Sequence, residues 1–389
     1  MADVSELERQ ARELLRPEVY DYYAGGSGGE VTLRANEEAW RRVRFLPRVL
    51  RDVSAVRTGV QLGPPLNLDL RTPLAVAPTA FHRLAHTEGE AATAAGAARA
   101  GALFVLSTRS SRRIEDVAAA VAGAGGSWWF QVYLMRDRGF NQELIARARA
   151  AQCSALVLTV DLQVQGLRRR DPKNGLSIPP RLTLRNALDI ATKPGWALRV
   201  LCGKRRSFGN LVGLGRPAGL TTLSAWIASQ FDPSVTWQDI AWVRSLWPGK
   251  LIIKGILDAE DARTAAAQGV DAIVVSNHGG RQLDGAPSSI SVLPEIVNAV
   301  AGRCEVWMDG GVQSGQDMLR ALALGAKACL IGKSFLYALG AMGGAGVTLA
   351  LNLLRRELEV SLALTGRTDI RQVDASILRV ASVPRSNPG

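Results

Sequence analysis

The sequence predicts an α/β fold, a TIM (β/α)8 barrel with a helical segment before it and a long insertion after its fourth strand. From residue 74 onward, eight short apolar runs alternate with eight helical patterns. Continuous apolar runs are typical of parallel strands that are buried on both faces. Eight such units over about 250 residues match a closed barrel better than an open doubly wound sheet.

The elements are expected in the following order. The strands are 74–78, 104–107, 128–133, 155–161, 251–256, 272–278, 305–311 and 328–333. The helices are 88–100, 112–121, 139–150, 236–246, 258–268, 290–300, 314–323 and one from about 334. A single helix is expected over 5–24, and the glycines at 25–29 follow it without a preceding strand, so they are not a dinucleotide fingerprint. We assign 1–375 to one barrel domain, 162–235 to an insertion within it, and 376–389 to a C-terminal tail.

Composition narrows the class of protein. The amphipathic start and the lack of an apolar run of ~20 residues lead us to expect neither a signal peptide nor a membrane-spanning helix. The cysteines show no metal-binding spacing, so free thiols in a cytoplasmic protein are expected. His82 and His86 lack a third ligand, so we expect loop or helix-start positions there and no metal. The net charge of +12 indicates an anionic partner: a substrate, a phosphate, a lipid surface or nucleic acid.

The segment SNHGGRQLDG at 276–285 carries the strongest indication of chemistry. It follows the apolar run 271–275, so His278 and Arg281 are expected at the carboxyl end of a buried strand. Imidazole exchanges protons near neutral pH, and a guanidinium can hold a carboxylate through two parallel hydrogen bonds. A base beside an anion-binding group suggests a small organic acid that loses a proton or a hydride. The alternative is a buried histidine that caps a turn.

Polar residues and glycines end the other predicted strands, at the face where barrels carry their active sites. They are Pro78, Thr79, Ala80, Ser107, Thr108, Gln131, Tyr133, Thr159, Asp161, Lys254, Ser276, Asp309, Gly310, Gly311, Gly332 and Lys333. Glycines after the seventh and eighth strands are typical of a phosphate site built from backbone N–H groups. The other side chains form a ring that suits a flat heteroaromatic ligand, on which Lys254 could stabilise negative charge.

These motifs resemble those of the FMN-dependent L-2-hydroxy acid oxidases and dehydrogenases. The matching segments are PTA at 78–80, QVY at 131–133, TVD at 159–161, KG at 254–255, SNHGGRQLDG at 276–285 and DGGV at 309–312. They occur in order along the chain, and SNHGGRQLDG is the most specific. Segments 178–189 and 242–257 resemble the mandelate dehydrogenase and hydroxymandelate oxidase branch. The resemblance implies FMN as cofactor and oxidation of a mandelate-like or lactate-like acid to the 2-oxo acid.

The resemblance also implies roles for the residues that would meet the substrate. His278 would be the base that faces the flavin, with Asp161 stabilising its imidazolium form. The substrate carboxylate would be bound by Arg281, Arg168 and Tyr22. The base could remove either the proton on Cα or the hydroxyl proton, with hydride transfer in the second case.

Further roles concern the substrate oxygen and the cofactor. Tyr133 would bond the substrate hydroxyl or the developing carbonyl oxygen, and Lys254 would lie near the N1/O2 edge of the flavin. Contacts with the isoalloxazine or ribityl groups are implied for Pro78, Thr79, Ala80, Ser107, Gln131, Thr159 and Ser276. Contacts with the ribityl and phosphate groups are implied for Asp309, Gly310, Gly311, Gln313, Gly332 and Lys333.

Four positions distinguish this chain within the family. Gln313 and Lys333 stand where the family usually has arginine; a charged hydrogen bond is worth about 1.5–3 kcal/mol, so we expect weaker FMN binding. Arg109 stands where glycolate oxidase has a tryptophan near the substrate. It could enlarge the anionic site, but we expect it to point into solvent. Ala80 is the oxidase-type residue and favours O2 as the electron acceptor, whereas the mandelate dehydrogenase branch favours a quinone.

The insertion at 162–235 contains two basic segments, 167–173 and 193–206, with Trp196 and leucines among the charges. A more apolar stretch follows at 220–231. This pattern suggests peripheral contact with an anionic membrane surface, and the resemblance to mandelate dehydrogenase implies the same, at the inner face of the membrane. A solvated lid over the active site is the alternative. We also expect a homotetramer.

Two other classes of function remain open. A different phosphate-binding barrel, an isomerase or a nucleotide dehydrogenase, would explain the glycines but not the combination of Tyr22, Tyr133, His278 and Arg281. A nucleic-acid-binding protein is suggested only by the net charge. The basic residues form no recognition motif, so we expect no nucleic-acid partner.

Overall fold

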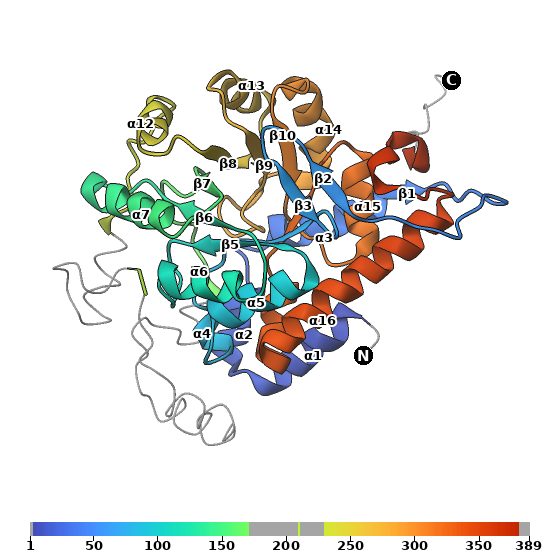
Figure 1. Ribbon diagram of the computed structural model, residues 1–389, viewed down its shortest axis with the longest axis horizontal. Helices are drawn as coiled ribbons and strands as arrows, with labels where there is room; N and C mark the ends of the chain where they lie inside the picture. Colours follow the sequence, from blue (N-terminus) through green and yellow to red (C-terminus); the bar gives the residue numbers. More distant parts are fainter. Residues whose placement is uncertain (1–2, 171–208, 211–228, 381–389) are drawn as a thin grey trace.

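The computed structural model describes residues 3–170, 209–210 and 229–380, and the core of this part is a closed barrel of eight parallel strands (Figure 1). The strands are β4 (Leu74–Val76), β5 (Leu103–Ser107), β6 (Trp128–Val132), β7 (Ala155–Thr159), β8 (Lys250–Ile256), β9 (Ala272–Val275), β10 (Glu305–Met308) and β11 (Cys329–Ile331). The pairing of β9 with β10 and of β11 with β4 closes the ring. The predicted TIM barrel is confirmed, and each strand lies within one residue of a predicted run.

Side chains fill the barrel interior. Trp129 on β6 and Trp307 on β10 are almost fully buried, and their ring centres lie 4.9 Å apart. Since β6 and β10 stand opposite one another in the strand order, the two rings meet across the barrel. Every residue of β4, β5, β6, β7, β9 and β11 is buried. Burial on both faces explains why these strands are apolar except for Ser107, Gln131 and Thr159 near their carboxyl ends.

Helices surround the barrel in Figure 1. They are α4 (His82–Ala85), α5 (Glu90–Ala100), α6 (Ile114–Ala122), α7 (Arg138–Ala150), α12 (Gln238–Leu246), α13 (Ala259–Ala267), α14 (Ser289–Val300), α15 (Gly315–Ala323) and α16 (Ser334–Leu364). Three of them begin at a side chain that accepts a first-turn backbone N–H, namely Asp137, Asp258 and Ser314. Such caps satisfy N–H groups that have no partner inside the helix, so each helix starts at a defined residue.

One described helix, α16, is long and apolar enough to cross a membrane by length and composition. Two thirds of its most apolar window is buried (67%), and it contacts α1 (Val4–Leu14), α5 and α15. Its helical geometry is interrupted at Gly343, where φ is 63° and ψ is −149°. These contacts make α16 a packing helix of the barrel.

The prediction of one helix over 5–24 is wrong, because the segment forms two helices, α1 and α2 (Pro17–Ala24). Pro17 has no N–H with which to continue α1, and it holds Arg16 in an extended conformation. A proline suits the first position of α2 for the same reason. Helix α2 then brings Tyr22 and Tyr23 to the mouth of the barrel, where both line a cavity.

Several elements were not predicted. They are α3 (Val31–Arg42), the antiparallel pair β1 (Val43–Phe45) and β12 (Leu378–Val380), the antiparallel pair β2 (Val60–Leu62) and β3 (Leu68–Leu70), and the short 3-10 helices η1 (Ile370–Gln372) and η2 (Ala375–Ile377). The strand β12 falls inside the predicted tail 376–389. Its pairing with β1 ties the end of the described chain to the segment that precedes the barrel.

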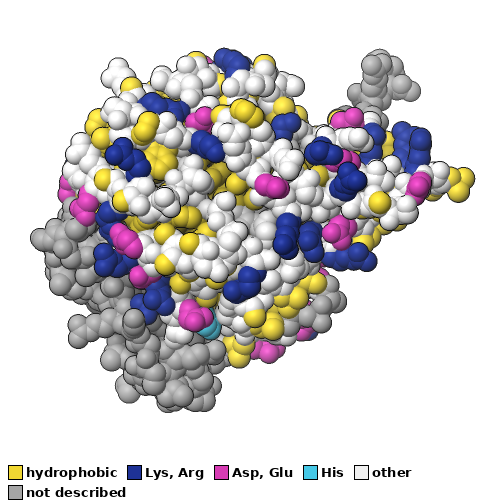
Figure 2. All heavy atoms as spheres, in the orientation of Figure 1, with side chains coloured by type: hydrophobic (Ala, Val, Ile, Leu, Met, Phe, Trp, Pro, Cys, Tyr) yellow, Lys and Arg dark blue, Asp and Glu magenta, His cyan; other side chains and the backbone are white. Residues whose placement is uncertain are grey.

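Only the two ends of the insertion, 162–170 and 229–235, and residues 209–210 are described. Segments 178–189 and 193–206, most of 220–231, and Cys202 lie outside the described residues. Lys and Arg side chains are spread over the face seen in Figure 2 and form no single stripe across it. This face therefore does not present the continuous basic track that suits a nucleic-acid backbone.

Candidate active site

A cavity at the carboxyl ends of the barrel strands encloses about 1140 Å³, part of it open to solvent. The predicted site residues that line it are Tyr22, Pro78, Thr79, Ala80, Ser107, Tyr133, Arg168, Lys254, His278, Arg281, Asp309, Gly310, Gly311, Gln313, Gly332 and Lys333. The sequence separates these residues by as many as 311 positions, and the closed barrel brings them together. A concave site with convergent polar groups is the usual place for a small ligand.

His278 follows β9 and is paired with an acidic residue from another strand. Its Nδ1 lies 2.9 Å from Oδ1 of Asp161, which follows β7. Burial opposes ionisation of Asp161, but the charge of His278, the hydrogen bond from its ring and the charge of Lys254 outweigh it, so the pKa of Asp161 is lowered. An ionised carboxylate at Nδ1 favours the tautomer whose Nε2 can accept a proton.

Lys254 ends β8 and is buried between polar partners. Its Nζ lies 2.8 Å from Oδ2 of Asp309 and 2.7 Å from Oγ of Ser276. Burial opposes the charged form, but Asp309 and Asp161 outweigh it and raise the pKa of Lys254. Lys254 therefore keeps a fixed positive charge beside the cavity, where it can stabilise negative charge on a bound ring.

Two arginines and a tyrosine line the same cavity. Nη1 of Arg281 donates to the carbonyl oxygens of Tyr22, at 2.8 Å, and Gly25, at 2.6 Å, and its guanidinium carbon lies 5.3 Å from the centre of the Tyr22 ring. Arg168 lies at the start of the insertion, and its buried Nε has no partner among the described residues. Guanidinium groups in such a place suit a carboxylate.

Two residues in the second half of the 276–285 segment, Gln282 and Asp284, form hydrogen bonds with the segments beside the site. Gln282 accepts from the N–H of Gly166, at 3.1 Å, and donates to the carbonyl oxygen of Asp161, at 2.6 Å. It thereby fixes the segment that leads to Arg168. Asp284 accepts from the backbone N–H groups of Gly29 and of Thr32, at 2.7 and 3.0 Å.

The glycines at 25–29 have a packing role. A Cβ at Gly26 would lie 2.8 Å from the carbonyl oxygen of Gly280, so only glycine permits this approach. The N–H of Ser27 donates to the same oxygen, at 2.9 Å. The loop therefore brings the end of α2 against the segment that carries His278 and Arg281.

The part of the cavity lined by Gly311, Gly332 and Lys333 has the features of a phosphate site. Gly311 has a φ of 76°, and a Cβ there would lie 2.4 Å from the carbonyl oxygen of Asn36. The space above Gly332 is open, since a Cβ there would meet only a methyl group of Thr79, at 3.9 Å. Lys333 donates from Nζ to the carbonyl oxygen of Ala24, at 2.7 Å. Burial, together with the nearby charge of Arg281, lowers the pKa of Lys333 to about 8.

Unpaired polar atoms test whether these residues fit FMN. Buried polar atoms usually have a hydrogen-bond partner, yet Gln131 Nε2, Thr159 Oγ1 and Asp309 Oδ1 have none among the described residues. They belong to three different strand ends around the cavity. Asp309 lines the cavity, where a flat ligand with donor groups at its edge would meet it, and the glycines at 310–311 and 332 leave room for a phosphate. The residues present therefore fit the cofactor that the resemblance implies.

Three of the predicted cofactor residues lie behind the cavity lining. Gln131 accepts through Oε1 from the Ser107 hydroxyl, at 3.3 Å, and Ser276 accepts from Lys254 and from the N–H of His278. Thr159 is buried beside them at the end of β7. From these positions the three residues can hold the lining residues in place, in addition to any direct contact with the cofactor.

Helix α3 supplies residues that the sequence reasoning missed. Asn36 and Glu37 line the cavity. The side chains of Asn36 and Asn277 exchange two hydrogen bonds, at 2.9 and 2.7 Å, and Nε1 of Trp40 donates to the carbonyl oxygen of Gly310, at 3.2 Å. The spacing of Thr32, Asn36 and Trp40 at intervals of four residues, all buried, was the signal that could have revealed this face.

The prediction that Arg109 points into solvent is wrong. Arg109 lines the cavity, and its guanidinium carbon lies 5.5 Å from the ring centre of Tyr133 and 4.7 Å from that of Phe231. The two aromatic rings take the place of water beside the arginine, and burial lowers its pKa. Phe231, at the end of the insertion, was not predicted as a site residue.

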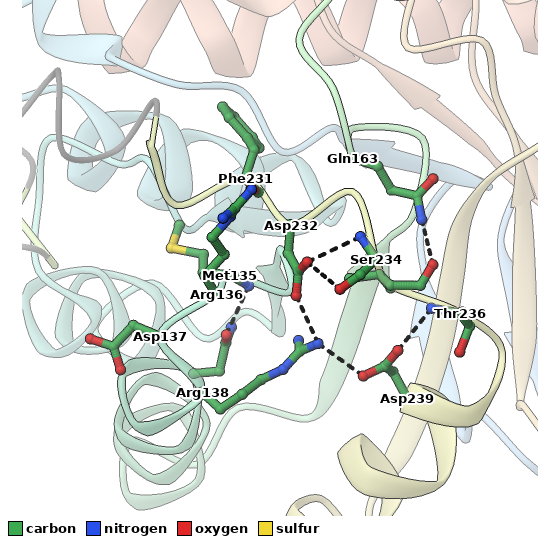
Figure 3. Close-up of polar contacts among 12 residues, drawn as sticks. Met135, Arg136, Asp137, Arg138, Gln163, Phe231, Asp232, Ser234, Thr236 and Asp239 are labelled. Carbon is green, nitrogen blue, oxygen red and sulfur yellow. Dashed lines mark hydrogen bonds and ion pairs between the residues drawn. The ribbon is translucent and has the colours of Figure 1, made fainter.

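Figure 3 shows how the segment around Phe231 is held in place. Phe231 forms an antiparallel bridge with Met135, which follows β6. Beside it, Arg138 lies between Asp232 and Asp239, with nitrogen–oxygen distances of 3.0 and 2.9 Å (Figure 3). The insertion therefore returns to the barrel at a fixed point, next to Tyr133.

His82 and His86 have structural positions. His82 begins α4, as predicted, and His86 follows the helix in an extended conformation at its C-cap. His82 is buried, and its ring nitrogens lie 2.6 and 3.0 Å from the hydroxyls of Thr79 and Thr93. In the part of the chain that the structure describes, no group of three or more His, Cys, Asp or Glu residues could hold a metal.

A barrel that combines a histidine–carboxylate pair, guanidinium groups and a cradle for a flavin belongs to the class of FMN-binding oxidoreductases. Comparisons with known proteins agree. The family described as FMN-dependent dehydrogenase matches residues 11–380. L-lactate dehydrogenase of Caulobacter sp. (strain K31) is 43% identical over 97% of this chain and 98% of its own. L-lactate oxidase of Nostoc sp. (strain PCC 7120 / SAG 25.82 / UTEX 2576) is 44% identical over 96% and 97%.

Solved structures are similar over nearly the whole chain. The crystal structure of the monotopic membrane protein (S)-mandelate dehydrogenase has a TM-score of 0.92 and 35% identity over 97% of this chain and 99% of that one. A crystal structure of mandelate oxidase has a TM-score of 0.81 and 39% identity over 97% and 98%. The chain belongs to the FMN-dependent dehydrogenase family, in which it is a 2-hydroxy acid dehydrogenase or oxidase. The predicted family and cofactor are confirmed.

Proposed function

We propose that the protein oxidises an L-2-hydroxy acid to the 2-oxo acid, with His278 as the base and Arg281 and Arg168 binding the carboxylate. The observation that carries the proposal is the pairing of His278 with Asp161 at 2.9 Å, beside Arg281 in one cavity. A base alone would serve many reactions. A base next to guanidinium groups selects a carboxylic acid as the substrate.

The reaction removes two electrons and two protons from the substrate. The C2–H and O–H bonds break, the C2–O bond becomes a carbonyl, and FMN, when bound, supplies the acceptor for the electron pair. His278 accepts one proton at Nε2, while the lowered pKa of Asp161 keeps a negative charge beside the resulting imidazolium. Both the proton on C2 and the hydroxyl proton are compatible with this role. The second hydrogen would leave with the electron pair to FMN, when bound, and the final acceptor of both electrons and both protons would be O2, giving H2O2, or a quinone, giving the quinol.

Tyr133 and Lys254 complete the proposed site. Burial raises the pKa of Tyr133, so its hydroxyl stays protonated and can donate to the substrate oxygen as the carbonyl forms. Lys254 carries the positive charge that a flavin needs near its N1/O2 edge. Lys333 and the glycines at 310–311 and 332 would hold the phosphate, and Gln313 would lie beside it.

The choice of acid and acceptor belongs to this proposal. The relatives are described as acting on L-lactate, and the structural neighbours as acting on mandelate, so both acids are candidate substrates. Ala80, which lines the cavity, supports O2 as acceptor. The neighbour described as a monotopic membrane protein supports peripheral membrane attachment. We propose that 162–235 makes this contact at the inner face of the membrane, where a quinone would be the acceptor. The homotetramer stays a prediction.

The test is a stopped-flow screen of the purified yellow protein. Anaerobic mixing with a 2-hydroxy acid should bleach the flavin absorbance, and the rate constants for L-lactate, L-mandelate and their D-isomers would rank the substrates. Re-oxidation by O2 and by a soluble quinone would then be compared on the same reduced protein. Failure of every L-2-hydroxy acid to bleach the flavin would overturn the proposed function.

A further inference from the structure

Arg109 is a cationic side chain in the cavity to which the proposed reaction gives no task. Its guanidinium lies over two aromatic rings, at 5.5 Å from the centre of Tyr133 and 4.7 Å from that of Phe231. Its buried Nε has no hydrogen-bond acceptor, and Arg109 forms no ion pair with any residue that the structure describes. Two aromatic rings are thus the contacts of this charge that the structure describes, and a cation in so confined a place is stabilised by an anion, so the site suits an anionic group on a ligand.

The other charges around the cavity are already accounted for. Among the residues that the structure describes, the acidic side chains in the lining are Asp309, which pairs with Lys254, and Glu37, which accepts a hydrogen bond from Gln313. Neither offers Arg109 a counter-ion. The positive charge of Arg168 lies close enough to repel that of Arg109. An anion bound between the two guanidinium groups would relieve this repulsion.

The aromatic contacts fix the direction in which Arg109 can bind. The two rings, whose planes are inclined by 76°, limit where the guanidinium can move. A guanidinium carries its N–H groups in its own plane, where they can hold a carboxylate by two parallel bonds. Phe231 is itself held by the bridge to Met135 and by the ion pairs of Arg138 shown in Figure 3. The group is therefore organised before the substrate arrives, which favours affinity.

We propose that Arg109 binds a second carboxylate on the substrate, so that the preferred substrate is a short 2-hydroxy dicarboxylic acid such as L-malate or L-2-hydroxyglutarate. The proposal rests on the proposed function, because Arg281 and Arg168 are taken to hold the first carboxylate. The second carboxylate lies on the substituent of C2, where lactate has a methyl group and mandelate a phenyl ring. An apolar substituent would bring no anion to the charge of Arg109.

The experiment compares acids and variants in two separate assays. Flavin reduction by L-malate, L-2-hydroxyglutarate, L-lactate and L-mandelate is measured anaerobically for the wild type, Arg109→Met and Arg109→Lys. Binding of succinate and of propionate, which have no hydroxyl group to oxidise, is measured by calorimetry on the same proteins. Arg113→Met is the matched control, because Arg113 lies four residues away, is exposed and is absent from the cavity lining.

We expect the better of the two dicarboxylic acids to exceed L-lactate in kcat/KM by roughly 10- to 100-fold in the wild type, the value of one charged hydrogen-bonded pair. The ratio of kcat/KM for that dicarboxylic acid to kcat/KM for L-lactate should fall to about one in Arg109→Met and partly recover in Arg109→Lys. The ratio of succinate to propionate affinity should follow the same pattern, and Arg113→Met should keep both ratios.

Two results would overturn the inference and leave the proposed function intact. One is efficient oxidation of L-lactate or L-mandelate with no preference for a dicarboxylic acid. The other is a dicarboxylate preference that Arg109→Met and Arg109→Lys both leave unchanged. Absence of flavin reduction by all four acids would overturn the proposed function instead, and the calorimetric ratio would then still report on the second carboxylate.

Discussion

Lys333 gives the binding of FMN a pH dependence that the usual arginine would not show. Burial lowers the pKa of Lys333 to about 8 in the protein without cofactor. A bound phosphate dianion favours the charged lysine and raises that pKa, so binding takes up a proton once the pH exceeds about 8. The second pKa of a phosphate monoester is about 6, so the phosphate itself does not titrate in this range.

The size of the change in the Kd for FMN follows from the fraction of Lys333 that is charged. At a pH of about 9 roughly one tenth of the cofactor-free protein carries the charge, so the Kd for FMN should be about tenfold higher than at a pH of about 7. The assay is quenching of FMN fluorescence on titration with protein from which FMN has been removed. Lys333→Arg should bind with a Kd that is nearly constant over this range, because arginine stays charged. A Kd for FMN that does not change with pH in the wild type, or that changes equally in the wild type and Lys333→Arg, would refute the reasoning.

Three further substitutions test single residues. Arg281→Lys should raise KM about tenfold or more, since lysine cannot reproduce the planar fork; an unchanged KM in steady-state assays would remove Arg281 from the carboxylate site. Asp161→Asn should slow flavin reduction roughly 100-fold, since an amide does not stabilise the imidazolium; stopped-flow rates equal to wild type would contradict the pairing as functional. Gln313→Arg should tighten FMN binding about tenfold, near the low end for a charged hydrogen bond. The gain is small because Glu37, which accepts from Gln313 at 3.2 Å, would compete with the phosphate for the new arginine. An unchanged Kd for FMN would show that other groups already satisfy the phosphate.

The barrel could be predicted because its strands carry their own signal. A strand buried on both faces is mostly apolar, as 103–106 and 272–275 are, and the eight runs are spaced by helices. The carboxyl ends then follow from the direction of the chain. This is why His278, Lys254 and Asp309 could be expected at one mouth before their distances were known.

The parts that could not be predicted depend on contacts between distant segments. Arginine is usually exposed, and Arg109 lies in the cavity beside Tyr133 and beside Phe231, which is 122 positions further along the chain. The break at Pro17 has a local cause and could have been predicted from the proline alone. Helix α3 was not predicted because its buried face carries Thr32 and Asn36. These polar residues bond to Leu283 and Asn277 of the 276–285 segment.

The central claim is that His278 takes a proton from a 2-hydroxy acid beside the flavin. The most direct measurement is anaerobic flavin reduction by a saturating L-2-hydroxy acid in wild type and in His278→Ala, with FMN content determined for both. Equal FMN content and a rate lowered roughly 10²- to 10⁴-fold in the variant are predicted. A variant that holds FMN and is reduced at the wild-type rate would contradict the claim.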